Sequence, residues 1–340
     1  MNTELSTVIN RPLSIGNRTI SKRLFLAPMT LLGNVAFREL LSIYGGYGLL
    51  FSEMSSARTI PNENRHVSAY FRWRDEEKKA LVWQLLGSNP KEMAIAARRI
   101  EREGFLGIDI NLGCSVANIC RKFGGAALLK NPDKAIRIVT AVRKVVSIPL
   151  FVKFRTGWTD TPHHAVDLAR RLEDSGVDAL TFHPRVAPDI RTRPPKWEYI
   201  GRIKEVVSIP VIGNGNVFEP EDCLKMFKTT GCDAVAVGRM AITRPWLFAQ
   251  WTLNFEPSKE IYKTIALQMS ALLSKHFDPA SALHRYKKFT QYFAANFRFG
   301  HTFYSLIQNV THMTAIDTAV KYFFTPPPDL CKQPNQNFMI

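Results

Sequence analysis

Short apolar runs, rich in β-branched and aromatic residues, recur eight times in the first three-quarters of the chain. Runs of this kind predict β-strands. They span residues 23–29, 48–54, 80–86, 106–111, 149–155, 178–183, 209–215 and 232–238. Stretches with apolar residues at helical spacing separate most of them, at residues 89–104, 131–146, 163–176 and 219–231. Strands that are apolar along their whole length and alternate with amphipathic helices are typical of a parallel sheet covered by helices.

Eight such strands in about 250 residues match the size of a (β/α)8 TIM barrel, a fold of the α/β class. A doubly wound open sheet is the alternative, but no G-x-G-x-x-G follows the first strand. Beyond residue 255 the pattern becomes purely helical, at residues 259–277, 280–299 and 302–324. We therefore predict a barrel domain over residues 1–255, a C-terminal helical domain over 256–325 and a polar, Pro-rich tail over 326–340.

Charge is the most unusual feature of the composition. The chain has 340 residues, of which 46% are hydrophobic, so an ordinary globular protein is expected. Its 45 Lys and Arg residues exceed its 29 Asp and Glu residues, which gives a net charge of +16. Such an excess favours a polyanionic partner, with nucleic acid as the first candidate. The N-terminus is polar, and no apolar run reaches the roughly 18 residues that span a bilayer, so we expect a cytoplasmic protein without a membrane contact.

Polar and reactive residues close almost every predicted strand. In a TIM barrel the catalytic groups stand at the C-terminal ends of the strands. These ends carry Pro28, Met29, Glu53, Gln84, Asn111, Cys114, Lys153, Arg155, His183, Asn214, Gly238 and Arg239. The last two strands end in GNGN (213–216) and GRM (238–240), where glycine backbones and Arg239 are suited to binding the phosphate of a cofactor.

Lys153 lies inside an apolar strand, where a lysine is rare, and a cation there could stabilise a reduced, anionic flavin ring. Cys114 allows several interpretations: a redox pair with Cys120, a metal ligand, a packed thiol or a proton donor. Metal ligands at regular spacing are missing around it, and no metal site is expected. An odd number of cysteines, five, does not indicate a disulfide framework. Cys114 is expected in the loop after the predicted strand 106–111. A thiol there with an ordinary pKa of about 8.5 is protonated at neutral pH and can donate a proton.

A series of motifs resembles one known family. They are LAPMTLLGNVAFRELL (26–41), SEM (52–54), WQLLGSNP (83–90), DINLGC (109–114), GGAALLKNP (124–132), VKFRTGW (152–158), HPR (183–185), IPVIGNGNV (209–217), AVGRMAITRPWLF (236–248) and, more weakly, HRYKKFTQYF (284–293). The chain resembles the dihydrouridine synthases of the bacterial type, flavoenzymes that reduce the C5=C6 bond of uridine in RNA, usually tRNA. This resemblance implies an FMN-binding, catalytic barrel, an RNA-binding helical domain and NADPH as the reductant.

The resemblance also implies a role for each site residue. Those expected around the flavin ring are Pro28, Met29, Gln84, Lys153 and His183, and those expected at its phosphate are Asn214, Gly215, Gly238 and Arg239. Cys114 would donate a proton to uridine C5 while flavin N5 delivers a hydride to C6. Contacts to the RNA would come from Asn111, Arg155, Arg185, Arg285, Lys287 and Lys288. Further basic residues expected at phosphates are Arg121, Lys122, Arg191, Arg193 and Lys196.

The chain departs from the family pattern at Ser115, Asn118 and Pro184, which all lie on the substrate side of the expected site. Three interpretations therefore stay in competition with reduction of tRNA. The substrate is ribosomal RNA, or the protein is an FMN barrel oxidoreductase that acts on a small molecule, or it is an RNA-binding protein that retains the fold without catalysis. A monomer is expected for this family.

Overall fold

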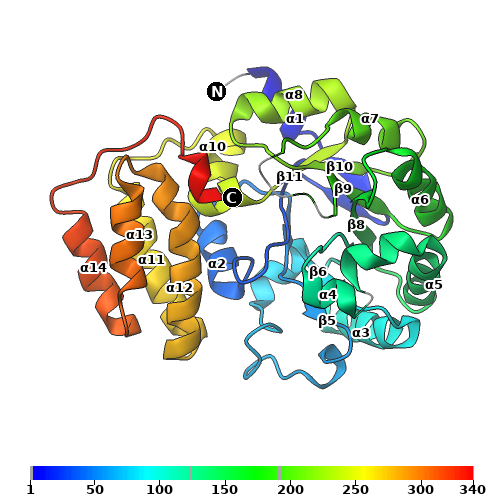
Figure 1. Ribbon diagram of the computed structural model, residues 1–340, viewed down its shortest axis with the longest axis horizontal. Coiled ribbons are helices and arrows are strands. Elements are labelled where there is room, and N and C mark those ends of the chain that lie inside the picture. Colours follow the sequence, from blue (N-terminus) through cyan, green and yellow to red (C-terminus); the bar gives the residue numbers. More distant parts are fainter. Residues whose placement is uncertain (1–2, 123, 188, 190–192, 340) are drawn as a thin grey trace. The chain divides into compact units, whose positions relative to one another are not determined.

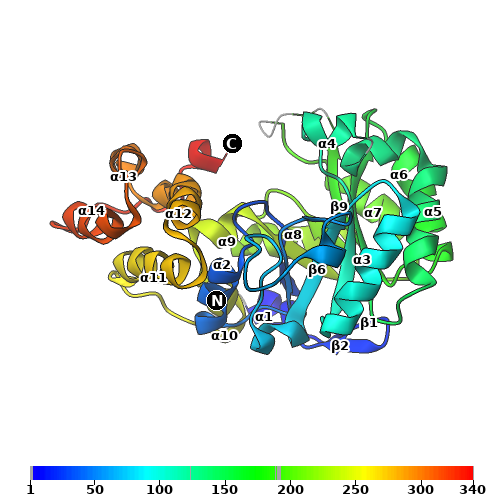
Figure 2. The same ribbon diagram turned by 90° about the horizontal axis from the view of Figure 1, so that it is seen from below.

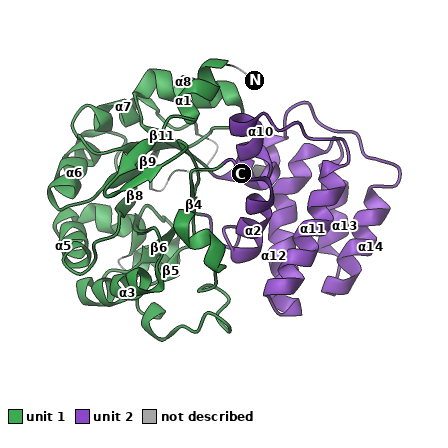
Figure 3. Cartoon of the chain, turned by 180° about the vertical axis from the view of Figure 1, so that it is seen from behind, with its two compact units in different colours: residues 1–28, 47–237 green, residues 29–46, 238–340 purple. Residues whose placement is uncertain are grey.

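The structure is a computed structural model that describes residues 3–122, 124–187, 189 and 193–339 (Figure 1). The chain divides into two compact units, shown in different colours in Figure 3. Unit 1 comprises Met1–Pro28 and Tyr47–Val237, and unit 2 comprises Met29–Gly46 and Gly238–Ile340.

Unit 1 contains a closed barrel. Within the described residues, eight parallel strands follow the order β4-β3-β11-β10-β9-β8-β7-β6, and β6 pairs with β4 to close the ring. These strands are β3 (Leu24–Leu26), β4 (Leu49–Phe51), β6 (Leu81–Leu86), β7 (Gly107–Leu112), β8 (Leu150–Gly157), β9 (Ala179–Val186), β10 (Val211–Asn214) and β11 (Ala234–Val237). The short β5 (Ser55–Ser56) also pairs with β6. All eight predicted strands are confirmed, and so is the TIM-barrel fold. The pairing of β6 with β4 closes the sheet and excludes the doubly wound open sheet.

The barrel interior changes from apolar to polar along the strands. One core cluster combines inward-facing residues of several strands, including Phe25, Phe51, Val82, Phe151 and Ile212. Side chains alternate between the two faces of a strand, so residues two positions further along face the same interior. This alternation places the polar residues of the strand ends directly above the apolar layer.

Helices surround the barrel (Figures 1 and 2). Those of unit 1 are α1 (Thr3–Ile9), α3 (Pro90–Glu103), α4 (Ala117–Arg121), α5 (Pro132–Arg143), α6 (His163–Asp174), α7 (Glu198–Lys204) and α8 (Pro220–Thr230), with the 3-10 turns η1 (Ile60–Asn62), η2 (Asp75–Ala80) and η3 (Gly125–Lys130). The Asn89 side chain caps α3 by accepting from the N–H groups of Lys91 and Glu92, and Pro90 occupies the first turn. Asn131 and Pro132 begin α5 in the same way.

A small antiparallel hairpin, β1 (Leu13–Ile15) and β2 (Arg18–Ile20), precedes the first barrel strand. Its residues Leu13, Ile15 and Ile20 belong to the same core cluster as the barrel interior. The sequence did not predict this hairpin, because each of its strands is only three residues long.

Unit 2 is helical. Its elements are α2 (Val35–Tyr44), α9 (Arg239–Thr243), α10 (Leu247–Leu253), α11 (Ile261–His276), α12 (Pro279–Phe293), α13 (Gly300–Gln308) and α14 (Ile316–Phe323), with η4 (Ala294–Asn296), η5 (Met313–Ala315) and η6 (Gln336–Met339). The helix predicted over residues 302–324 is therefore two helices, separated around the β-branched pair Val310 and Thr311. Phe293, Phe297 and Phe303 pack against one another in the core of this unit.

The helix α2 follows a barrel strand in sequence but packs with the C-terminal helices. Glu39 on α2 forms an ion pair with Lys275 at 2.7 Å, and its carboxylate lies within hydrogen-bonding distance of His276 Nε2, at 2.5 Å, both at the end of α11. Tyr44 also donates a hydrogen bond to Gln268. The predicted domain boundaries at residues 255 and 325 stay predictions.

The Pro-rich C-terminal segment of unit 2 contacts η4 of the same unit through its backbone. The N–H of Cys331 donates to the carbonyl of Asn296, and the N–H of Asn335 donates to that of Ala295, both at 2.8 Å. No helix in the described parts of the chain is both long and apolar enough to cross a membrane.

Candidate active site

Polar side chains gather at the C-terminal ends of strands β6 to β10 in unit 1. Gln84 lies in register with Asp109, Asn111 with Lys153, and Arg155 with His183. Residues in register on neighbouring parallel strands point to the same face of the sheet. Since Lys153 lies two positions beyond the interior residue Phe151, this set faces the mouth of the barrel.

A continuous hydrogen-bond network joins two of these strand ends, those of β6 and β7, to the Cys114 loop. Gln84 Nε2 donates to Asp109 Oδ2 at 2.6 Å, and Asn111 Nδ2 donates to Gln84 Oε1 at 2.9 Å. Asn111 Oδ1 then accepts from the backbone N–H groups of Gly113, at 3.0 Å, and Cys114, at 2.9 Å. The network fixes the turn that presents the cysteine.

Cys114 is half-buried at the end of this turn. Gly125, with φ of +56°, lies so close that a Cβ there would come within 2.4 Å of the Cys114 carbonyl oxygen. The Ala126 N–H donates to the same oxygen at 2.8 Å. Glycine is therefore needed at residue 125 both for its conformation and for this close approach.

The environment of Cys114 keeps its thiol protonated at neutral pH. Burial, and to a lesser extent the neighbouring Cys120, raises the pKa of the Cys114 thiol. A backbone hydrogen bond from Val116 and the charges of Arg155 and Lys153 act in the opposite direction without cancelling this effect on the pKa. All five cysteines are free thiols. A protonated thiol can donate a proton but is a poor nucleophile.

Lys153 adds a cation to the same mouth. No hydrogen-bond or ion-pair partner of its ammonium group is found among the described residues. Burial and the charge of Arg155 lower the pKa of Lys153 to about 8, and Asp109 opposes this shift. The group therefore still carries its charge at neutral pH and is suited to an anionic ligand.

The end of β10 forms a tight loop beside His183. Gly215 has φ of +121°, and a Cβ at this position would lie 2.8 Å from His183 Cδ2. The Gly215 carbonyl accepts from Trp197 Nε1 at 2.9 Å, and Asn214 Nδ2 donates to the Ala236 carbonyl of β11 at 2.8 Å. Glycine is therefore needed at residue 215 both for its conformation and because His183 occupies the space of a side chain.

The four remaining residues predicted to contact the cofactor are Pro28, Met29, Gly238 and Arg239. Pro28, at the end of β3 in unit 1, is half-buried. Met29, Gly238 and Arg239 are also half-buried but belong to unit 2. Gly238 directly follows β11 and is the residue before α9, which begins at Arg239.

Comparisons with known proteins identify the family of the chain. The family model described as "Dihydrouridine synthase (Dus)" matches residues 25–322. The chain belongs to the dihydrouridine synthase family. It is therefore an oxidoreductase, as the resemblance in sequence implied.

Relatives in this family match along most of their length. The tRNA-dihydrouridine synthase B of Klebsiella pneumoniae is 38% identical over 236 residues, which cover 69% of this chain and 73% of that protein. The enzyme of the same name from Pseudomonas aeruginosa is 36% identical over 238 residues, 69% of this chain and 70% of that protein. The probable tRNA-dihydrouridine synthase of Rhizobium leguminosarum bv. phaseoli is 31% identical over 279 residues and covers 82% and 87%.

Solved structures with the same fold are more distant. An old yellow enzyme homologue from Zymomonas mobilis has a TM-score of 0.52 at 16% identity, over 76% of this chain and 96% of that chain. Morphinone reductase in complex with tetrahydroNAD has a TM-score of 0.52 at 15% identity, over 74% and 92%. At this level of identity the likeness supports the barrel fold alone.

The residues predicted to bind RNA differ in their availability. Arg185 is buried, with Nη2 donating to Asn216 Oδ1 at 3.1 Å. Arg285 is only 3% exposed, and its guanidinium lies 4.3 Å from the ring centre of Phe277. This burial speaks against the predicted contact between Arg285 and a phosphate. Arg285 packs inside unit 2, and the pattern of apolar residues along α12 did not reveal that it is buried.

Lys287 and Lys288 are half-buried and already hydrogen-bonded. Lys287 Nζ donates to the Gln308 carbonyl at 2.8 Å, and Lys288 Nζ donates to Gln291 Oε1 at 2.8 Å. Lys287 thus joins α12 to the end of α13. Its role at RNA stays a prediction, and so does that of Lys288.

The basic residues of unit 1 also differ from one another. Lys196 forms an ion pair with Asp160 at 2.8 Å, and Arg193 forms one with Asp189 at 3.3 Å. Lys122, at the end of α4, is exposed, and no acid among the described residues lies within ion-pairing distance of it. Arg121 is exposed and donates to Asn118. Arg191 lies outside the described residues.

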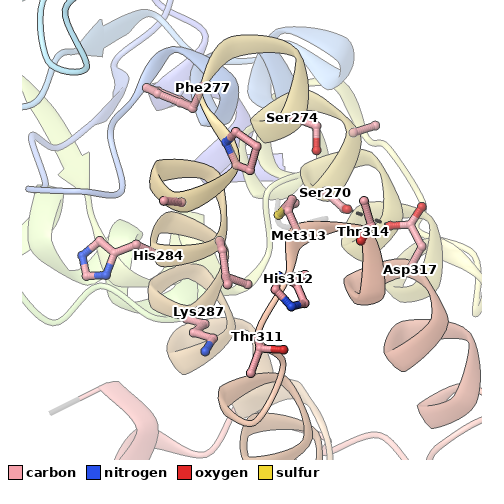
Figure 4. Close-up of a pocket in the computed structure, with 14 residues that line it drawn as sticks. Ser270, Ser274, Phe277, His284, Lys287, Thr311, His312, Met313, Thr314 and Asp317 are labelled. Carbon is pink, nitrogen blue, oxygen red and sulfur yellow. Dashed lines mark hydrogen bonds between the residues drawn. The ribbon is translucent and has the colours of Figure 1, made fainter.

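Unit 2 contains an open pocket of about 1030 Å³ between α11, α12 and the segment 311–317 (Figure 4). His284, Lys287 and His312 line it, but so does Asp317, whose carboxylate accepts from Ser270 at 2.7 Å. Since an acid shares this pocket with the basic groups, its charge does not favour an anion alone. Among the described residues, no cluster of His, Cys, Asp and Glu is suited to a metal ion.

Asp109 and Gly125 were missed in the sequence as site residues. A carboxylate at residue 109 inside an apolar strand, two positions before Asn111 and thus on the same face, was the available signal. The role of Gly125 depends on its contact with Cys114, which no local pattern shows.

Proposed function

We propose that this protein reduces uridine to 5,6-dihydrouridine in tRNA, with FMN as cofactor and NADPH as reductant. The observation that carries the proposal is the arrangement at the barrel mouth. Cys114 lies in the turn after β7 that Asn111 holds, and Lys153 lies in register with Asn111, with no hydrogen-bond or ion-pair partner of its ammonium among the described residues. Family membership supports the reaction, and the names of the relatives support tRNA.

The residues present fit FMN. The backbone of Gly215 packs against His183 with φ of +121°, a glycine conformation that loops binding phosphate groups use. The Lys153 ammonium has no partner among the described residues, as expected for a group that meets an anionic ring. The residues that would hold the ring are Pro28, Met29, Gln84, Lys153 and His183, and those that would hold the phosphate are Asn214, Gly215, Gly238 and Arg239.

The chain's own chemistry is the transfer of one proton. When bound and reduced by NADPH, FMN supplies a hydride from N5 to uridine C6. The Cys114 thiol donates its proton from Sγ to C5, so that one hydride and one proton saturate the C5=C6 bond. The resulting thiolate is stabilised by Lys153 and Arg155, whose charges already favour it, until solvent returns the proton. Asn111 would contact the base.

RNA binding follows from the charge and the location of the site. A net charge of +16 favours a polyanion. A base inside a helical stem cannot reach a barrel mouth, so the target uridine must be unstacked or extruded. Ribosomal RNA and free pyrimidines are the competing substrates. We expect a cytoplasmic monomer.

The test uses RNA that lacks the modification. Total tRNA and ribosomal RNA from a strain without this protein are incubated with the purified protein, FMN and NADPH, and nucleosides are analysed by mass spectrometry. We expect dihydrouridine in tRNA and none in ribosomal RNA or in free uridine. Product only in ribosomal RNA, or only from the free nucleoside, would replace this proposal with the corresponding alternative.

A further inference from the structure

Asp109 is a buried carboxylate that the proposed reaction does not use. It is fully buried on β7. One of its oxygens, Oδ2, accepts from Gln84, while the other, Oδ1, has no hydrogen-bond partner among the described residues. Burial raises the pKa of Asp109, although the hydrogen bond from Gln84 and the charge of Lys153 oppose this. A buried acid with one unsatisfied oxygen is costly, which suggests a function.

The hydrogen-bond network has only one consistent direction. The backbone N–H groups of Gly113 and Cys114 can only donate, so the Asn111 atom that they contact must be the oxygen. Asn111 then presents its amide nitrogen to Gln84, whose oxygen accepts. Gln84 is left with its nitrogen facing Asp109, which must accept. Asp109 Oδ2 supplies the acceptor at the inner end of the network, and this oxygen stabilises the amide orientations that the two backbone N–H groups require.

We propose that Asp109 is a positioning residue that sets the amide orientations of Gln84 and Asn111 and, through them, the backbone of the Cys114 loop. The proposal rests on the proposed function in that the positioned thiol is the proton donor. It goes beyond that function because the proposed reaction assigns Asp109 no step, and the side chain bonds to Gln84. If the side-chain amides of Gln84 and Asn111 were both reversed, the Asn111 NH2 group would face the backbone N–H groups of Gly113 and Cys114. The turn would then lose its two hydrogen bonds from Asn111.

A second role, as a charge partner of Lys153, gives a different expectation. No ion pair between Asp109 and Lys153 is found among the described residues, so their interaction is longer in range. Asp109→Asn removes the charge but keeps an oxygen that can accept from Gln84. Asp109→Leu removes both at similar size. If Asp109 is a positioning residue, Asp109→Asn should keep the activity that Asp109→Leu loses. If Asp109 acts through its charge, both variants should lose that activity.

The first measurement uses protein without flavin. Cys114 is alkylated with iodoacetamide across a range of pH, and its peptide is quantified by mass spectrometry. Besides burial and a backbone hydrogen bond from Val116, the titratable and charged groups that act on this thiol are Cys120 of α4 and Lys153 and Arg155 of β8, and these three side chains are kept. In Asp109→Leu the released turn should expose the thiol, so we expect alkylation at least threefold faster and a midpoint moved towards about pH 8.5. Asp109→Asn should stay within twofold of the wild type.

The matched control is Trp83→Phe on β6. It removes another buried hydrogen bond, from Trp83 Nε1 to Ser55 Oγ at 3.2 Å, on the strand that carries Gln84. We expect wild-type alkylation of Cys114 in this variant. If Asp109→Leu does not fold, Gln84→Leu interrupts the same network with Asp109 intact and should give the same faster alkylation.

The second measurement follows turnover with tRNA. Asp109→Leu should lower kcat at least tenfold with little change in KM, and Asp109→Asn should restore most of it. Three results would each overturn the positioning role. The first is alkylation of Cys114 at the wild-type rate in both Asp109→Leu and Gln84→Leu, and the second is an equal loss of kcat in Asp109→Asn and Asp109→Leu. The third is the same change in Trp83→Phe as in Asp109→Leu. Absence of dihydrouridine with the wild-type protein would instead refute the proposed function, because the alkylation result is independent of it.

Discussion

At the scale of single residues, conformation and contact explain why the site needs two glycines. Gly125 admits the carbonyl of Cys114, and Gly215 admits the ring of His183. Both have positive φ, which L-residues rarely adopt. The sequence indicated Gly215 because it ends a predicted strand in a glycine-rich loop.

Gly215→Ala should weaken FMN binding. The added Cβ would collide with His183 and hold the backbone in a strained conformation, which costs about 1–3 kcal/mol. We expect at least a tenfold increase in the Kd for FMN, measured by quenching of flavin fluorescence. Gly104→Ala is the control, because Gly104 also has positive φ, +83°, but no atom within 4 Å of the added Cβ. It should lower stability and leave the Kd unchanged, and an unchanged Kd in Gly215→Ala would remove that glycine from the cofactor site.

At the scale of elements, the strands and the main helices could be predicted because their patterns are local. The run PLFVKFR predicts β8 from its apolar residues alone, and Asn89 with Pro90 marks the start of α3. The hydrogen bonds between Asp109, Gln84 and Asn111 join residues 25 and 27 positions apart in the chain. Such a network depends on strand register, which the sequence alone does not state.

The packing of α2 shows the same limit. Its own sequence predicts neither the contacts of Glu39 with Lys275 and His276 nor the place of α2 among the C-terminal helices. The burial of Arg285 is similar, since its neighbour Phe277 belongs to the end of the preceding helix. The packing of α2 and the burial of Arg285 thus depend on contacts between elements, which the hydrophobic pattern of one helix does not reveal.

Glu39 should make the stability of unit 2 depend on pH. Burial acts to raise the pKa of Glu39, but hydrogen bonds from His276 and Lys275 outweigh it and lower that pKa. A carboxyl whose pKa is lower in the folded state adds stability above its unfolded pKa, near about 4.3, and loses this contribution as the pH falls through the folded value. Glu39→Gln should therefore cost about 1 kcal/mol at pH 7 and progressively less below about pH 4.

Urea unfolding of the full chain, followed by circular dichroism, measures this difference. Glu205→Gln serves as the control, because Glu205 pairs with Arg202 on an exposed surface and such pairs contribute little. A free-energy difference between the wild type and Glu39→Gln that stays constant down to pH 3 would show that the ion pairs do not hold α2 in place.

At the scale of the whole molecule, the net charge of +16 should make RNA binding sensitive to salt. Each phosphate contact contributes about one unit to the slope of log affinity against log salt. We expect Lys122→Ala to reduce this slope for tRNA by about 1, because this lysine is exposed and has no acidic partner among the described residues. Lys196→Ala should change it less, since Asp160 already pairs with Lys196.

Filter binding of tRNA between about 50 and 200 mM salt gives both slopes. A slope near zero for the wild-type protein would argue against a phosphate-dominated contact and favour a small-molecule substrate. Equal slopes for Lys122→Ala and the wild type would move the RNA contact away from the end of α4.

The central claim is that Cys114 supplies a proton to uridine, and single-turnover kinetics test it most directly. The NADPH-reduced flavoprotein is mixed anaerobically with unmodified tRNA, and flavin oxidation and dihydrouridine are followed together. We predict that Cys114→Ala binds FMN and tRNA and accepts electrons from NADPH at wild-type rates, but oxidises its flavin with tRNA about 10² to 10⁴ times more slowly. Dihydrouridine formed by this variant at the wild-type rate would contradict the account.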